Sequence, residues 1–322
     1  MALVYASESM SRTVRIATRE SQLALAQTRM VAAALRERHP GIEVELVPMT
    51  TKGDRVLDRP LAQVGGKGLF VKELENAMAE GRADLAVHSM KDVPMVLPPE
   101  FALATFGERE QPLDAFVSNR HESLAALPRG ARVGTSSLRR EAQLRNAHPA
   151  LDVRALRGNV NTRLAKLDAG DYDAIVLAAA GLRRLGFAER IRALLSDYVP
   201  AIGQGILAVE FPAGREDIAA LLTPLEHFET AAAARAERAT GLVVEGSCEV
   251  PLGAHARIVG SHIDLAAFLG LPDGTRLARA EGQAAIAEAE SLGRSVARQL
   301  LEAGGREILA QLRPLEARKG AA

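Results

Sequence analysis

The sequence is poor in several residue types, and each shortage excludes a class of protein. It holds one cysteine, which excludes an intrachain disulfide and a multi-cysteine metal site. It has no tryptophan and only 3% aromatic residues, so it lacks the stacking platforms of single-strand nucleic-acid binders. Lys+Arg and Asp+Glu total 40 each, so the chain has no net positive charge that would attract a polyanion. The seven histidines show no HExxH or zinc-finger spacing. We therefore predict neither a nucleic-acid partner nor a bound metal.

Long hydrophobic runs are also missing. The first 12 residues contain no apolar core of a signal peptide and are not Arg-rich as a transit peptide is, so we expect a cytoplasmic protein with no membrane partner. The 322 residues are 48% apolar and 25% charged, which is typical of a soluble globular chain with two or three domains.

Short β-type runs alternate with helical patterns over the first two thirds of the chain, which predicts mostly parallel sheets covered by helices. One series places strands at 13–18, 42–48 and 84–89, and a second places them at 115–118, 131–135, 152–156 and 173–181. In the first helix, the spacing predicts one apolar face, made by Leu23, Ala26, Met30, Ala33 and Ala34.

Residues 200–211 form a further apolar strand after a glycine-spaced turn, and we expect this strand to rejoin the first sheet. The predicted fold class is α/β, with two α/β domains and a smaller C-terminal α+β domain. The predicted boundaries are 12–107 with 203–223 for the first domain, 111–199 for the second and 226–314 for the third. The crossings near 106–107 and 201–203 would be paired hinges.

The stretch AVHSMKDVP carries a predicted strand directly into Lys91 and Asp92 and then stops at Pro94. A carboxylate at the carboxyl end of an α/β strand lies where such folds bind ligands. Two interpretations stay open from these residues alone: a surface pair that caps a turn, or a catalytic carboxylate.

Hydroxyl groups and arginines follow other predicted strands. Ser21 precedes the first helix, and Thr135, Ser136 and Ser137 precede a helix of the second series, where either plain capping or anion binding is possible. Guanidinium groups recur after successive strands of the second series, at Arg139, Arg140, Arg157, Arg163, Arg183 and Arg184. Repetition along one sheet edge favours a ligand that carries several carboxylates or phosphates.

The single cysteine, Cys248, lies in the segment VEGSCEVPLG, between Gly246 and Pro251. A lone cysteine is usually a small buried hydrophobe, but glycine and polar neighbours here suggest an accessible thiol. No histidine is adjacent in sequence to activate it, so a permanent covalent attachment is as plausible as turnover chemistry.

Eight motifs in order resemble those of the porphobilinogen deaminases, also called hydroxymethylbilane synthases. They span about Arg15 to about Leu312 and read RIATRESQLAL, VGGKGLFVKELE, AVHSMKDVP, GTSSLRR, LRGNVNTRL, AAAGLRRLG, AIGQG and EGSCEVPLG. The resemblance implies that the first two domains are similar to periplasmic binding proteins and that the third carries a cofactor cysteine. It also implies a transferase that joins four porphobilinogen molecules head to tail, with release of ammonia, into a linear hydroxymethylbilane for tetrapyrrole and haem biosynthesis.

The same resemblance implies site residues. Cys248 would hold one covalent dipyrromethane cofactor per chain by a thioether, and Asp92 would be the catalytic carboxylate. Lys67 would belong to a mobile lid and Gln204 would lie at the hinge. Further residues would bind the carboxylates of cofactor and substrate, namely Arg19, Ser21, Ser89, Lys91, Thr135, Ser137, Arg139, Arg140, Arg157, Arg163 and Arg184. We expect porphobilinogen as the small-molecule partner and a monomeric chain.

This chain departs from the family pattern at a few positions. Gln22 stands where many members have proline and Ala26 where many have tryptophan; Gln63 and Asn161 are also unusual. A second hypothesis, of a different class, is a non-catalytic solute-binding or ligand-sensing module for a small polyanion. That module would use the helix ends and arginines but would leave the Cys248 segment and the third domain without a role.

Overall fold

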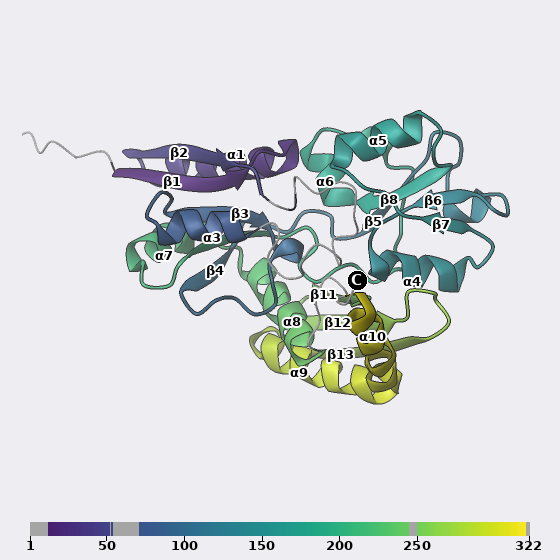
Figure 1. Ribbon diagram of the computed structural model, residues 1–322. Coiled ribbons are helices and arrows are strands. Elements are labelled where there is room, and N and C mark those ends of the chain that lie inside the picture. Colours follow the sequence, from purple (N-terminus) through teal and green to yellow (C-terminus); the bar gives the residue numbers. More distant parts are fainter. Residues whose placement is uncertain (1–11, 52, 54–70, 245–249, 320–322) are drawn as a thin grey trace, which may run out of the picture.

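The computed structural model describes residues 12–51, 53, 71–244 and 250–319, and three sheets organise them. Figure 1 shows the three corresponding units, with the N-terminal unit at the left, the middle unit at the right and the C-terminal unit below them. The predicted class, two α/β units followed by a smaller C-terminal one, is confirmed. No helix in the described part of the chain is long and apolar enough to span a membrane.

The N-terminal unit is built on a five-stranded sheet of order β2-β1-β3-β10-β4. Its strands are β1 (Arg12–Arg19), β2 (Ile42–Met49), β3 (Leu85–Ser89), β4 (Phe101–Phe106) and β10 (Leu207–Pro212). The first three are mutually parallel, whereas β10 runs antiparallel to both β3 and β4. The prediction that the chain returns to the first sheet after the second unit is therefore confirmed.

Three helices cover this sheet, namely α1 (Gln22–Arg38), α3 (Lys72–Ala79) and α7 (Glu216–Leu222). Helix α1 begins at Ser21, whose hydroxyl accepts a hydrogen bond from the Ala24 amide, and it ends before Pro40 and Gly41. The face predicted for this helix is wrong, since Met30 is 46% exposed. The buried face instead consists of Ala24, Gln27, Thr28, Val31, Ala32 and Leu35.

The middle unit repeats the arrangement of the N-terminal one, with sheet order β7-β6-β8-β5-β9. Its strands are β5 (Asp114–Val117), β6 (Arg132–Gly134), β7 (Asp152–Arg154), β8 (Ala174–Ala178) and β9 (Ala193–Leu194). Again three strands are parallel, and β5 pairs antiparallel with β8. The helices are α4 (Leu138–Ala147), α5 (Val160–Asp168) and α6 (Ala179–Arg184). The carboxyl ends of β6, β7 and β8 thus share one edge, as predicted.

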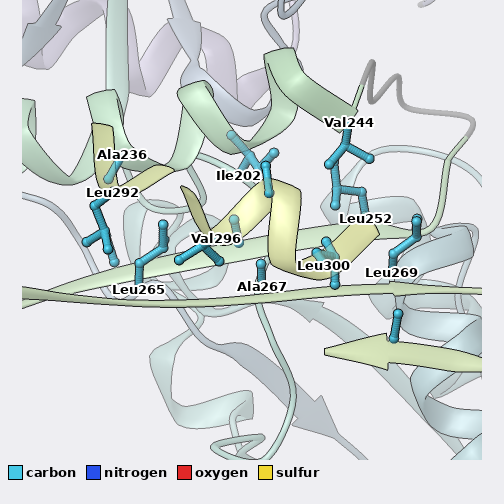
Figure 2. Close-up of a cluster of buried hydrophobic side chains, with 14 of the residues drawn as sticks. Ile202, Ala236, Val244, Leu252, Leu265, Ala267, Leu269, Leu292, Val296 and Leu300 are labelled. Atoms are coloured by element: carbon cyan, nitrogen blue, oxygen red, sulfur yellow. The ribbon is translucent and has the colours of Figure 1, made fainter. Parts of the chain in front are cut away.

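The C-terminal unit packs helices on one antiparallel sheet. The sheet has the order β11 (Leu252–Val259), β12 (His262–Gly270) and β13 (Leu277–Ala285), and the helices are α8 (Phe228–Val244), α9 (Ala289–Leu300) and α10 (Arg306–Lys319). Figure 2 shows Val296 of α9 next to Leu265, and Leu300 near Leu252 and Leu269, in a continuous apolar core. Ile202, from the second crossing between the α/β units, inserts into the same core, so this crossing is attached to the C-terminal unit.

Candidate active site

The Asp92 side chain lies directly beyond the end of β3, in a short 3-10 turn formed by residues 90–92. The Val93 amide closes the turn by donating to the Met90 carbonyl, at 3.1 Å. The Lys91 ammonium donates to Asp92 Oδ1 at 3.1 Å, and 38% of the Asp92 side chain is exposed. Asp92 is therefore held at the sheet edge with part of its carboxylate accessible.

The surroundings of Asp92 favour its ionised form. Burial by itself raises the pKa of Asp92, because it disfavours the charge. The positive charges of Lys91 and Arg19, together with the Lys91 hydrogen bond, outweigh burial, and the pKa of Asp92 lies below its usual range. At neutral pH the turn therefore presents a carboxylate.

A small pocket opens at this edge, between β3 and the start of α1. Four residues predicted for the site line it together: Arg19, Ser21, Ser89 and Asp92. Its wall also includes Gln27, a residue that the sequence did not single out. Gln27 Nε2 donates to the Ser89 hydroxyl at 2.9 Å, so α1 fixes the last residue of β3 before the turn.

One arginine of the middle unit, Arg163, lies near enough to Asp92 for its charge to matter. Burial and then the charges of Arg140 and Arg157 lower the pKa of Arg163 to about 10, while the negative charge of Asp92 acts in the opposite direction. Arg163 therefore stays protonated at neutral pH, and it is near enough to Asp92 for their charges to interact. One arginine of the predicted edge therefore lies within electrostatic range of Asp92, across the two units.

These arginines still have donors to offer. Among the described residues the Arg157 guanidinium has no polar partner, and Arg163 donates only through Nε, to the Gly158 carbonyl at 2.8 Å. The Arg184 Nη2 donates to the Gly205 carbonyl at 2.7 Å, but its buried Nε is unsatisfied. A buried donor without a partner is costly, so it is expected to meet an acceptor on a ligand.

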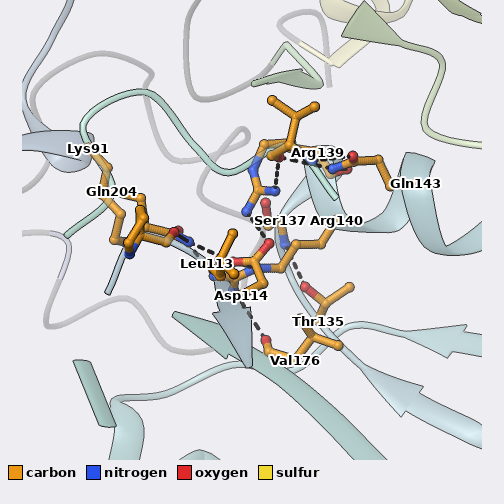
Figure 3. A network of polar contacts seen from close by, with 12 residues as sticks. Lys91, Leu113, Asp114, Thr135, Ser137, Arg139, Arg140, Gln143, Val176 and Gln204 are labelled. Atoms are coloured by element: carbon orange, nitrogen blue, oxygen red, sulfur yellow. Dashed lines mark hydrogen bonds and ion pairs between the residues drawn. The ribbon is translucent and has the colours of Figure 1, made fainter. Parts of the chain in front are cut away.

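Arg139 and Arg140 are situated differently, because both are already paired inside the protein. Figure 3 shows them converging on Asp114 at the start of β5. Arg139 Nη2 lies 2.7 Å from one oxygen of Asp114, and Arg140 Nη2 lies 2.8 Å from the other. The Gln204 amide donates to the same carboxylate at 2.8 Å. The sequence predicted ligand contacts for these two arginines and did not predict that they share Asp114, which also binds Gln204 at the crossing between the units.

The remaining predicted polar residues lie near the start of α4. The Thr135 side chain is buried, and its hydroxyl accepts from the Ser137 amide at 3.3 Å. Ser137 occupies the N-cap position of α4, yet its side chain makes no capping hydrogen bond there. Arg183 pairs with Glu110 at 3.1 Å on the exposed surface.

Comparison with known proteins gives the family. The description "Porphobilinogen deaminase, dipyromethane cofactor binding domain" matches residues 14–220, and "Porphobilinogen deaminase, C-terminal domain" matches residues 231–302. The chain belongs to the porphobilinogen deaminase family. A porphobilinogen deaminase from Burkholderia thailandensis is 57% identical over 317 residues, with 96% of both chains covered. Another from Paraburkholderia phymatum is 56% identical over 305 residues, with 93% of both chains covered.

A solved structure also overlaps with part of the chain. The periplasmic aliphatic sulphonate binding protein SsuA from Escherichia coli is 13% identical, with a TM-score of 0.41, and the match covers 72% of this chain and 70% of that one.

Two residues that the porphobilinogen deaminase pattern singles out, Lys67 and Cys248, lie outside the described residues. The segment that carries Cys248 connects the end of α8 to the start of β11, so it belongs to the C-terminal unit by its place in the chain. Among the described residues no group of three or more His, Cys, Asp or Glu side chains is arranged to hold a metal.

The sequence did not indicate a second ionic centre, in which Glu237 of α8 binds the two segments that cross between the α/β units. Arg109 Nη1 donates to Glu237 Oε1 at 2.6 Å, and the Gly203 amide donates to the other oxygen at 2.6 Å. The Ala256 amide of β11 donates to Glu237 Oε1 at 2.8 Å. One carboxylate therefore joins both crossings to the C-terminal unit. Its only sequence signal is a charged residue on the otherwise alanine-rich face of a predicted helix.

Proposed function

We propose that this porphobilinogen deaminase uses Asp92 as its catalytic carboxylate and the middle-unit arginines to bind the carboxylates of cofactor and substrate. The observation that supports this assignment is that an ionised Asp92 at the pocket and Arg163 of the other unit lie near enough for their charges to interact. The alternative of a non-catalytic binding module is not favoured, because the C-terminal unit that it leaves unexplained matches the family's own C-terminal domain.

The residues present fit a dipyrromethane group, which carries several carboxylates. Arg157, Arg163 and Arg184 of the middle unit keep guanidinium donors without a partner among the described residues, which ligand carboxylates would bind. Arg19, Ser21, Ser89 and Lys91 would contact it from the N-terminal unit, and Cys248 would hold it through sulfur. When bound, this group supplies the free pyrrole carbon to which porphobilinogen units are added.

Asp92 would act on the charge that the reaction creates. The aminomethyl group of porphobilinogen is an ammonium at neutral pH, as a lysine is, so ammonia leaves with the electrons of the C–N bond and without prior protonation. A cationic methylene-pyrrole is left behind. A fixed carboxylate stabilises that cation, and it can accept the proton that leaves the attacking carbon once the new C–C bond has formed. The low pKa of Asp92 keeps the charge available for this role.

The other roles follow from position. We infer that Lys67 belongs to a mobile lid. We also infer that five residues contact the ligand and, in addition, fix the geometry of the middle unit where its strands end, namely Gln204, Thr135, Ser137, Arg139 and Arg140. We also infer domains at 12–107 with 203–223, at 111–199 and at 226–314. We also infer that the protein is a monomer in the cytoplasm and has no nucleic-acid partner.

The test removes the negative charge of the Asp92 side chain and keeps its size. Asp92→Asn is expected to form product on the order of a hundredfold more slowly than the parent, the scale of losing a positioned transition-state group. Asp171→Asn, at an exposed aspartate of the middle unit, is the matched control and should match the parent.

Cofactor loading must be measured on the same samples, because Asp92 is also expected to be needed for assembling the cofactor. Intact mass gives the loading, with Cys248→Ala as the bare reference. An Asp92→Asn protein that is fully loaded and turns over within about tenfold of the parent would leave Asp92 as a turn-capping residue only.

A further inference from the structure

An arginine of the C-terminal unit holds the turn that carries Asp92. Arg238 lies on α8, and its Nη2 donates to the backbone carbonyls of Pro94 at 2.9 Å and Met95 at 2.8 Å. Its Nη1 approaches the sulfur of Met90 at 3.9 Å. One guanidinium therefore contacts the chain on both sides of Asp92.

The charge of Arg238 has no acidic partner within the described part of the chain, which makes these contacts unusual. Burial lowers the pKa of Arg238, and no carboxylate among the described residues offsets that cost. An arginine on a helix surface normally extends into solvent or pairs with an acid. Here the partly buried cation donates through Nη2 to two successive carbonyls, so the fold uses it to fix the backbone of residues 94–95.

The packing around this contact leaves the turn little freedom. A Cβ atom on Gly241, one turn further along α8, would lie 2.6 Å from the sulfur of Met95. A Cβ atom on Gly203, whose φ is +69°, would lie 2.3 Å from Met90 Cγ. The segment 90–95 is thus seated between α8 and the second crossing, and Arg238 is its polar attachment to α8.

We propose that Arg238 is a positioning residue through which the C-terminal unit, the part of the chain that contains Cys248, sets the place of Asp92. A shift of α8 relative to the N-terminal sheet would displace Pro94 and Met95, and with them the carboxylate two residues earlier. The neighbouring Glu237 attaches the same helix to the Gly203 amide. The inference rests on the proposed role of Asp92, but the anchoring can be measured without it.

The experiment uses the full chain loaded with its cofactor, as checked by intact mass. In Arg238→Met the Val93 amide, which closes the turn on the Met90 carbonyl, should exchange with deuterium at least several-fold faster. The kcat for product formation should fall by about tenfold or more with KM within about twofold, because a misplaced catalytic group affects the chemical step more than ground-state binding.

Two further variants make this result specific. Arg235→Met removes an exposed arginine of the same helix and should match the parent in exchange and kcat. Arg238→Lys keeps the charge but offers a single ammonium, so it should fall between parent and Arg238→Met. If Arg238→Met does not fold, Arg238→Gln, which is too short to reach both carbonyls, should show the same faster exchange and lower kcat.

The outcomes separate the two proposals. Val93 exchange and kcat equal to those of Arg235→Met would overturn the anchoring role. A lower melting temperature with unchanged kcat per loaded enzyme would also overturn it, since Arg238 would then only support the fold. Faster Val93 exchange with unchanged kcat, together with a fully active Asp92→Asn, would instead refute the catalytic role of Asp92 and leave the anchor in place.

Discussion

Asp114 offers the sharpest test of how the units are held together. Its carboxylate is completely buried and accepts hydrogen bonds from Arg139 at 2.7 Å, from Arg140 at 2.8 and 3.0 Å and from Gln204 at 2.8 Å. Asp114→Asn keeps the size of the side chain and removes the charge. Two buried guanidinium groups would then share a neutral amide, and at least one donor would lose its acceptor.

The expected loss is large because the partners stay buried. Breaking a buried ion pair from one side destabilises proteins by about 3–5 kcal/mol, and here one anion serves two cations. With a urea dependence of about 2 kcal/mol per molar, the unfolding midpoint should fall by about 2 M.

The pH dependence has a definite sign. Burial raises the pKa of Asp114, but Arg139 and Arg140 outweigh it and hold the pKa far below its usual range. A group with a depressed folded-state pKa contributes stability above its unfolded pKa of about 3.9, and this contribution is lost as pH falls below that value. The Asn variant should therefore show its full deficit at pH 7 and a smaller one near pH 3.

The unfolding midpoints of the parent and of Asp114→Asn are measured by urea unfolding followed by circular dichroism, on samples matched for cofactor loading. The control is Asp168→Asn, which breaks the surface pair with Arg190 at 2.6 Å, where 49% of the Asp168 side chain is exposed, and should cost less than about 1 kcal/mol. Adding Arg140→Met to Asp114→Asn should recover part of the loss, because one stranded cation is gone. Equal midpoints for Asp114→Asn and Asp168→Asn would refute the argument.

Two further predictions concern the arginines Arg157 and Arg163 and the partly buried histidine His255. Arg157→Met and Arg163→Met should fold with nearly parental melting temperatures. They should nevertheless show reduced cofactor loading by intact mass or a KM raised by about tenfold, because the free donors of the parent arginines would bind ligand carboxylates. Parental loading and KM in both variants would contradict this assignment. Burial, with the charges of Arg109 and Arg257, lowers the pKa of His255 to about 3, so stability is lost as pH falls below about 6.5, by about 2 kcal/mol at pH 5. Urea midpoints at pH 7 and pH 5 should move less in His255→Gln than in the parent, and equal shifts would show that other groups carry the slope.

The alternation of strands and helices was enough to predict the two α/β units and the return of β10, because buried parallel strands are short apolar runs between longer amphipathic segments. The third strand of the C-terminal sheet, β13, escaped prediction. Its sequence, LARAEGQAA, is rich in alanine and also holds glycine, residues with little intrinsic preference for strands. Pairing with β12 over nine positions makes it a strand, and such pairing is not visible locally.

What the sequence did not predict near the site has a common cause, which is that polar groups are buried with partners distant in the chain. Gln27 and Thr28 sit on the inner face of α1 because Ser89 and Thr18 satisfy them, so the apolar stripe read from the sequence was shifted. The sequence gives no local sign that Arg139 and Arg140 share a partner inside the protein, because Asp114 lies about 25 residues earlier in the chain. Asp92 and Ser21 could be placed correctly because strand ends and helix starts are local features.

Two of the positions at which this chain departs from its family touch each other. Asn161, at the start of α5, donates its side-chain amide to the Gln22 side chain at the start of α1, at 2.5 Å, and so connects the middle unit to the N-terminal unit near the pocket. A single hydrogen bond of this kind contributes about 1 kcal/mol or less at an exposed site. It can bias the two units toward the observed separation, but it cannot lock them there. The buried centres at Asp114 and Glu237 lie instead at the crossings, so these stronger ionic contacts act on the crossings and not on the contact between Asn161 and Gln22.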